Sequence, residues 1–260
     1  MMEIFLKSLI FIFGLAVGSF LNCLIYRSVT NQSIWRGRSF CPHCHHQLVW
    51  RDLIPVFSFL FLKGRCQYCG QKISWQYPLV EIATGGMFLL IFNSQLPIAN
   101  CQSLLTISYW LLIISLLIVI FVCDLRYYLI PDKIIYPAIG LTFLYQLIVN
   151  YQFFVSLIFS ALAAAGFFGL LFLLSRGRWL GWADVKLVFL IGLLLGWPKI
   201  LIGLFLAFFL GALVGSGLMI TGRKNLKSEL PFAPFLITGL VLTLFWGDYF
   251  LAWYQNFFML

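Results

Sequence analysis

Two aspartates lie beside long apolar runs of the chain, where ionisable residues are rare. Asp124 lies in CDLRYYLIPD and Asp184 in GWADVKL, each at the edge of a long apolar run, in a chain with only eight acidic residues. Ionisable groups at membrane depth are costly and are candidates for function by default. Two carboxyl groups at matching depth can share one proton, so that the ionised group activates water and the neutral group hydrogen-bonds the carbonyl under attack. The pair predicts aspartyl-type peptide hydrolysis; the alternative is that each aspartate only caps a helix or pairs with an arginine.

Lys186 does not neutralise Asp184 by proximity in sequence, because residues two apart on a helix do not face each other. We therefore expect Asp184 to lack a local partner, and Lys186 to reach the headgroups or a substrate carboxylate. The run ADVKLVFLIGLLLGW spans about 22 Å at ~1.5 Å per residue, which is shorter than a hydrocarbon core of about 30 Å. Asp184 is expected to lie slightly inside the membrane.

A second chemistry is indicated by two CxxC pairs, CPHC and CQYC, separated by 21 residues. This spacing matches a four-thiolate tetrahedral zinc site whose ligands would be Cys41, Cys44, Cys66 and Cys69. A segment of roughly 50 residues cannot bury much core, so a bound metal is a reasonable way to stabilise its fold. Two disulfides are the alternative, which a reducing cytoplasm disfavours.

The histidines and the remaining cysteines are not predicted to bind the metal. A histidine beside the first pair could replace one thiolate, but with four well-spaced cysteines we expect exposed loop residues at His43, His45 and His46. The remaining cysteines share no spacing pattern, and small apolar fillers are expected at Cys23, Cys101 and Cys123.

The elements that must position these residues are membrane-spanning helices. The chain has 260 residues, 62% of them hydrophobic and 10% charged, with a mean hydropathy of +0.99. A soluble domain needs a more polar surface, and several runs approach the ~20 apolar residues that cross a bilayer. We expect an all-α polytopic membrane protein with about eight transmembrane helices and a small zinc-binding cytoplasmic loop domain between helices 1 and 2. The expected spans are 4–26, 78–97, 104–123, 134–150, 152–174, 183–197, 200–220 and 232–255.

The basic residues indicate the orientation. Of the 17 lysines and arginines, 15 fall in connections on one side of these spans, and only Lys7 and Lys199 lie elsewhere. Basic connections are typically cytoplasmic, so both chain ends are expected to point outward. The net charge of +9 is then an orientation signal and a contact with lipid headgroups, and nucleic acid is not an expected partner. The 15 residues are Arg27, Arg36, Arg38, Arg51, Lys63, Arg65, Lys72, Arg126, Lys133, Arg176, Arg178, Lys186, Arg223, Lys224 and Lys227.

The order of short motifs resembles the bifunctional prepilin peptidases, the membrane leader peptidases of type IV pili, competence pili and type II secretion. The motifs run in register along nearly the whole chain: GSFLNCLIYR, CPHC, CQYC, YPLVE, DLRYYLIPD, GWADVKL and PFAPF. The resemblance implies that Asp124 and Asp184 are the catalytic pair and that Asp132 is structural. The family pattern Gly-x-Gly-Asp is changed here, because Ala183 replaces the second glycine, and Ala233 likewise stands in PFAPF where the family usually has glycine.

The resemblance also implies the reaction and its location. Members cut a short basic leader, after a glycine, from prepilins or pseudopilins whose apolar N-terminal helix lies in the bilayer, at the cytoplasmic face of the bacterial inner membrane. Bifunctional members then methylate the new amino terminus with S-adenosylmethionine. By resemblance Gly64 belongs to that methyl transfer, and Asn22 and Glu81 lie in motifs flanking the loop. The residues alone spell out no nucleotide-type cofactor site, so the methyltransferase expectation depends on the resemblance.

The expected organisation has three parts: transmembrane helix 1 over residues 1–26, a zinc-binding loop domain with the methyltransferase part over 27–77, and a transmembrane aspartyl peptidase domain over 78–260. Two other classes fit some of the same residues. A proton-coupled transporter could place Asp124 and Asp184 in a cavity, but inverted repeats are not seen. A membrane thiol oxidoreductase could use the CxxC pairs, provided that they are free of metal.

Overall fold

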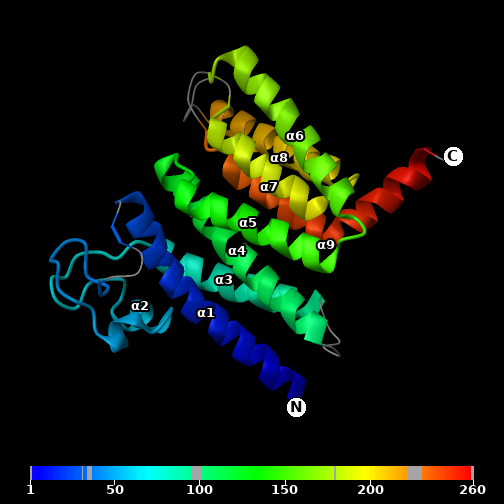
Figure 1. The fold of residues 1–260 in the computed structure, drawn as a ribbon. Helices are drawn as coiled ribbons and strands as arrows, with labels where there is room; N and C mark the ends of the chain where they lie inside the picture. Colours follow the sequence, from blue (N-terminus) through cyan, green and yellow to red (C-terminus); the bar gives the residue numbers. More distant parts are fainter. Residues whose placement is uncertain are drawn as a thin grey trace. The chain divides into compact units, whose positions relative to one another are not determined.

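The computed structural model describes residues 2–30, 32–33, 37–94, 101–178, 180–221 and 230–258. Within these ranges the chain is helical, and the only β-type pairings are two isolated bridges, Phe40 with Gln47 and Arg65 with Lys72. The predicted all-α fold is confirmed. The helices form two compact units, Met1–Val119 and Ile120–Leu260, drawn in Figure 1. Four of the basic residues used for orientation lie outside the described residues: Arg36, Arg223, Lys224 and Lys227.

The first unit is built on α1 (Met2–Val29) and α3 (Gln76–Ser94), which pack side by side (Figure 1). Small residues allow the close approach: a Cβ added at Gly18 would lie 2.6 Å from the Cα of Glu81, and one at Gly14 would lie 2.7 Å from the Cα of Gly85. Membrane helices commonly associate through such small-residue stripes. One turn further along α1, Asn22 Nδ2 donates a hydrogen bond to the Tyr77 carbonyl at 3.1 Å. The two helices are therefore held at a fixed register.

The connection between α1 and α3 contains a 3-10 helix, η1 (Trp50–Leu53), a short helix, α2 (Phe57–Phe61), and two cysteine turns. We call these turns the first knuckle (residues 40–47) and the second knuckle (residues 65–72), after the isolated bridge that closes each of them. The cysteine turns were expected from the sequence, and the two short helices were not.

The second unit contains the end of α4 (Cys101–Tyr127) together with α5 (Asp132–Val149), α6 (Phe154–Ser175), α7 (Trp182–Leu195), α8 (Lys199–Ile220) and α9 (Ala233–Phe258). Helix α7 contacts α5, α6, α8 and α9. Glycine again sets the closest approaches, since an added Cβ at Gly192 would collide with Ala161 of α6, and one at Gly239 would collide with the Gly203 carbonyl of α8. Helix α7 is thus the central helix of this unit.

Among the described residues, seven helices are long and apolar enough to cross a membrane: α1, α3, α4, α5, α6, α8 and α9. The remaining expected span, 183–197, corresponds to α7, which has only 14 residues. At ~1.5 Å per residue it is about 21 Å long, shorter than the hydrocarbon core. Nine of its residues are buried, so its surroundings are mostly other helices. The expectation of about eight spans becomes seven long helices and one short, enclosed helix.

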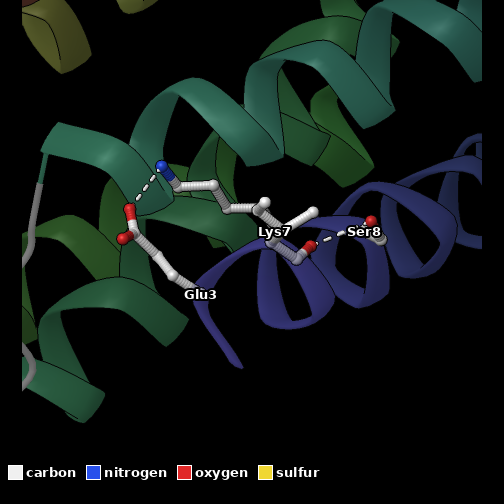
Figure 2. Close-up of polar contacts among 4 residues, drawn as sticks. Glu3, Lys7 and Ser8 are labelled. Carbon is white, nitrogen blue, oxygen red and sulfur yellow. Dashed lines mark hydrogen bonds and ion pairs between the residues drawn. The ribbon is translucent and has the colours of Figure 1, made fainter. Parts of the chain in front are cut away.

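The two basic residues that fall away from the others are both ion-paired. Lys7 Nζ lies 2.6 Å from Glu3 Oε1 in the first turns of α1, where Ser8 Oγ also donates to the Ile4 carbonyl at 2.9 Å (Figure 2). Lys199 Nζ, at the start of α8, lies 2.8 Å from Asp248 Oδ1 of α9. Each of these lysines therefore has a carboxylate beside it.

Candidate active site and metal centre

Asp124 lies near the end of α4, in the second unit, and is only 8% exposed. Its Oδ2 accepts a hydrogen bond from the backbone N–H of Ala233, the first residue of α9, at 3.0 Å. A helix N-terminus carries partial positive charge and unsatisfied N–H groups, so it is a favourable place for a carboxylate. The helix ends soon afterwards at Tyr127, and the next residue, Tyr128, has a left-handed φ of 54°. The PFAPF motif thus supplies a backbone donor to Asp124.

Asp184 lies in the first turn of α7 and is partly exposed. Its Oδ2 accepts the N–H of Gly181 at 3.0 Å, and its own N–H donates to the Gly181 carbonyl at 3.1 Å. The expectation that Asp184 lacks a local partner is wrong, because the backbone three residues earlier supplies one. Asp184 therefore caps its own helix.

The two carboxyl groups are near enough for an electrostatic interaction between Asp124 and Asp184. Each accepts a backbone N–H through one oxygen, Oδ2. An ionised carboxylate has about four acceptor positions, so one such hydrogen bond leaves capacity for water, a shared proton or a substrate carbonyl. Helix capping and acid–base chemistry are therefore compatible at these two residues.

Lys186 is held by Asp132 and not by Asp184. Its Nζ lies 2.6 Å from Asp132 Oδ1 and 4.8 Å from the ring centroid of Tyr136, both on α5. Headgroups or a substrate carboxylate were the expected partners of Lys186, whereas in the structure its ammonium group is paired with a carboxylate of α5. The ion pair and the cation–π contact join the first turns of α5 and α7. They hold the first turn of α7, which carries Asp184.

The four predicted cysteine ligands come together in the first unit. The sulfur atoms of Cys41, Cys44, Cys66 and Cys69 all lie within 4.8 Å of one another, with Cys41 Sγ and Cys69 Sγ 3.9 Å apart. In a tetrahedral site with Zn–S bonds of ~2.3 Å the sulfur atoms are about 3.8 Å apart. The cluster can therefore hold a metal ion such as zinc.

The electrostatics of the cluster also suit a cation. Burial raises the pKa of Cys41, but hydrogen bonds from the backbone of Cys44 and His43 and from neighbouring thiols outweigh burial and lower the pKa to about 7. The backbone at Gln71 lowers the pKa of Cys69, but burial and the other three thiols raise it to about 12. Cys41 therefore has a lower pKa than Cys69. A divalent cation among the sulfurs would remove the repulsion that opposes four thiolates.

The two knuckles share one backbone pattern. In the first, the N–H of Cys41 donates to the carbonyl of His46, and the N–H of His45 donates back to Cys41; in the second, Cys66 pairs in the same way with Gln71 and Gly70. The position after each pair is left-handed, with φ of 57° at His45 and 70° at Gly70. The His45 ring stacks on Phe40 and the His46 ring lies against Tyr68. His45 is therefore the counterpart of a turn glycine.

We expect His45→Gly to retain the full metal content. A left-handed conformation costs a residue with a side chain about 1–2 kcal/mol, and glycine loses about 0.5–1 kcal/mol more backbone entropy. The free energy of unfolding of the loop should consequently rise by about 0–1.5 kcal/mol. Metal analysis and thermal unfolding of the purified protein measure both quantities. His45→Ala, which keeps the strained conformation, is the matched control and should be less stable than His45→Gly. Loss of metal from His45→Gly would make His45 a ligand.

Gly64 lies just before the second knuckle, and its conformation is one that glycine favours. Its φ is +66°, and an added Cβ would lie 3.1 Å from the ring of Phe59. Its N–H donates to the Phe59 carbonyl at 2.8 Å, and its carbonyl accepts the N–H of Ile73 at 2.7 Å. Gly64 thus connects α2 to the second knuckle.

The sequence motifs flanking the loop also prove to be in contact with it. Glu81 of α3 is buried, and its Oε2 accepts the N–H of Val56 at 2.7 Å. Val56 has a φ of 60°, which is unusual for a β-branched residue. Glu81 therefore fixes the turn before α2. Neither this contact nor the backbone donor at Ala233 was predicted, because both join segments that are distant in sequence.

Comparisons with known proteins agree with this architecture. A model of the bacterial peptidase A24 N-terminal domain matches residues 12–95, and a model of the type IV leader peptidase family matches residues 111–216. A prepilin leader peptidase/N-methyltransferase of Bacillus subtilis is 33% identical, with 95% of this chain and 97% of that protein covered. The proteins of the same name from Legionella pneumophila and Aeromonas hydrophila are 32% and 29% identical, covering 98% and 97% of this chain and 96% and 94% of their own lengths. No solved structure matches the chain. The likeness extends over both units, and the chain belongs to the type IV leader peptidase family.

Proposed function

We propose that this protein cleaves the leader peptide from type IV prepilins and prepilin-like proteins and then methylates the new amino terminus. The observation that carries the proposal is the placement of Asp124 and Asp184 at two helix N-termini of the second unit, near enough to interact electrostatically. The relatives named prepilin leader peptidase/N-methyltransferase support both activities. The two alternatives, a proton-coupled transporter and a thiol oxidoreductase, gain no support. The four cysteines converge on one cluster suited to a metal, which disfavours the oxidoreductase.

The peptidase step follows from the two carboxyl groups. The ionised aspartate takes a proton from a water molecule, whose oxygen attacks the scissile carbonyl carbon. The neutral aspartate gives its proton to the carbonyl oxygen, which yields a neutral tetrahedral intermediate. On collapse the C–N bond breaks, one aspartate gives its proton to the leaving amine, and a hydroxyl of the intermediate returns a proton to the other aspartate, so that the pair again holds a single proton for the next cycle. Asp132 stays paired with Lys186 throughout and positions the first turn of α7.

The substrate would be a prepilin or pseudopilin with a basic leader and an apolar N-terminal helix. Seven long apolar helices make this a multi-pass membrane protein, and its lipids are the second partner. We place it in the bacterial inner membrane with the active site and the cysteine cluster on the cytoplasmic side. The connections that carry most of the lysines and arginines support that orientation. Lys7 and Lys199, the two basic residues away from the others, also fit it, because each is ion-paired with a carboxylate. Cleavage would then take place where the leader emerges from the bilayer.

We assign the methyl transfer to the loop domain, residues 27–77, and the hydrolysis to residues 78–260. The methyl donor would be S-adenosylmethionine, used as a co-substrate. Gly64 is placed in this half by resemblance, and its left-handed backbone supports a requirement for glycine there. Zinc held by Cys41, Cys44, Cys66 and Cys69 would be structural, because four protein ligands leave no open position.

Incubation of the full-length protein with a prepilin and S-adenosylmethionine, followed by mass spectrometry of the trimmed chain, tests both activities. The expected product begins immediately after the leader glycine and carries one added methyl group on its amino nitrogen. Omitting S-adenosylmethionine should give the cleaved, unmethylated chain. An intact prepilin would contradict the peptidase, and a cleaved product that stays unmethylated with the donor present would contradict the methyltransferase.

A further inference from the structure

The connection between the two knuckles exposes an unusual amount of apolar surface. Seven large apolar side chains between residues 49 and 61 have exposed fractions of 39% to 82%. They belong to η1, α2 and the turns around them: Val49, Trp50, Leu53, Ile54, Phe57, Leu60 and Phe61. We call residues 49–62 the apolar segment. Exposed apolar surface on this scale marks an interaction site.

The polar and apolar sides of the segment are separated. Asp52, its only acidic residue, accepts hydrogen bonds from the N–H of Val49 at 3.1 Å and from the hydroxyl of Tyr68 at 3.2 Å. This carboxylate therefore faces the second knuckle. Phe59 is buried, with its ring 4.9 Å from that of Trp75. The loop thus anchors the segment through Asp52 and Phe59, and the other large side chains project outward.

The contacts of Val56 place the segment alongside the membrane-spanning helices. The N–H of Val56 donates a hydrogen bond to Glu81. Glu81 lies five residues after the first residue of α3, a distance of about 7.5 Å along the helix. The Cα of Glu81 packs against Gly18 of α1. Gly18 lies eleven residues before the last residue of α1, a distance of roughly 16 Å along the helix. The connection therefore folds back along the flank of α1 and α3 (Figure 1). Both helices are candidate spans, so Val56 lies beside residues that belong to candidate membrane-spanning helices.

The charges around the segment fit an anionic bilayer surface. Arg51 lies over the Trp50 ring, with 5.3 Å between the guanidinium carbon and the ring centroid. Lys63 and Arg65 follow α2 directly, and both are exposed. Apolar and aromatic side chains flanked by cations are the composition of interfacial membrane segments.

We propose that the apolar segment is embedded in the lipid leaflet on the loop side of the membrane, with α2 in the acyl-chain region and Arg51, Lys63 and Arg65 among anionic headgroups. The segment would then attach the cysteine cluster to the bilayer surface by a third point, in addition to α1 and α3. A re-entrant segment is tolerated at this depth because its turn is hydrogen-bonded to Glu81. This inference does not depend on the enzymatic activity of the protein.

Photocrosslinking in nanodiscs tests the proposal. Benzoylphenylalanine is introduced at position 61, where Phe61 is 82% exposed, in the full-length protein in phosphatidylethanolamine and phosphatidylglycerol. The matched control carries the same group at Gln67, which is exposed on the second knuckle. After irradiation, mass spectrometry should find several-fold more phospholipid adduct at position 61 than at position 67. Unchanged metal content in both variants reports that the loop is folded.

Three results would overturn the proposal. Equal lipid adduct at positions 61 and 67, or none at either, would leave the segment outside the leaflet. An adduct joining position 61 to another part of this protein would show that protein covers it. With prepilin added, a crosslink from position 61 to prepilin in place of lipid would assign the surface to the substrate.

Discussion

Asp124→Asn and Asp184→Asn are each expected to lower the rate of leader cleavage by about 10²–10⁴-fold, the usual contribution of a general acid or base. Neither variant should misfold for lack of a hydrogen bond, because asparagine keeps a side-chain oxygen that can accept the N–H of Ala233 or Gly181. The measurement is single-turnover cleavage of a prepilin by each purified variant. What asparagine removes is the ability to exchange a proton, and that loss is the expected cause of the slow rate.

The matched control for both variants is Asp248→Asn. Asp248 is also a helical aspartate, but its partner is Lys199 and its side chain is exposed. Losing an exposed ion pair costs about 0–1 kcal/mol of stability, so cleavage should continue at nearly the rate of the unmodified protein. Wild-type cleavage by Asp124→Asn or Asp184→Asn would remove that residue from the mechanism.

Cys41→Ser and Cys66→Ser should each release the metal and unfold the loop between α1 and α3. Both side chains are buried, and each is the first cysteine of its knuckle. Structural zinc contributes about 10–16 kcal/mol of apparent binding free energy in zinc-finger peptides, whereas a 50-residue loop has little core of its own. The expected results are a metal-to-protein ratio near zero and rapid proteolysis between residues 37 and 76.

Cys23→Ser is the control, since Cys23 lies on α1 outside the cluster and should retain the metal. If Cys41→Ser and Cys66→Ser kept their metal, the ligand set would be wrong, and the histidines of the first knuckle would be the next residues to test. The effect on cleavage is informative as well. A variant that no longer methylates prepilin but still cleaves it would support the assignment of methylation to the loop and of cleavage to the second unit.

Local spacing made the metal centre predictable. Two CxxC pairs specify two turns of known shape, and a tetrahedral cation requires its four sulfurs to meet, so the cluster was expected before any coordinates. The same reasoning separated the cysteines from the three histidines beside them, His43, His45 and His46, which are all exposed. The long helices were predictable for a similar reason, because a bilayer fixes the length of an apolar run.

What could not be predicted depends on contacts between distant segments. Nothing near Lys186 in sequence indicates Asp132, 54 residues away, and nothing near Asp124 indicates the backbone of Ala233, 109 residues away. The cap at Asp184 was one of the alternatives that the sequence left open, since an acidic residue in the first turn of a helix is a recognised signal. Its partner was not named, because Gly181 lies before the helix begins.

The apolar segment was missed for a different reason. Hydrophobic residues between two cysteine turns are expected to form a small core, and Phe59 does so. Its neighbours Phe57, Leu60 and Phe61 do not, because the five-residue α2 can bury only one face against the loop. Sequence periodicity over so short an element cannot distinguish a side chain that faces protein from one that faces lipid.

The pH dependence of leader cleavage is the most direct test of a shared proton between Asp124 and Asp184. A bell-shaped profile of kcat/KM is expected, falling at low pH as the base becomes protonated and at high pH as the acid loses its proton, with both apparent pKa values belonging to the pair. Asp248→Asn should leave both limbs in place. A profile with only one limb, or one that is flat across the range in which the protein stays folded, would contradict a mechanism in which the two carboxyl groups hold one proton between them.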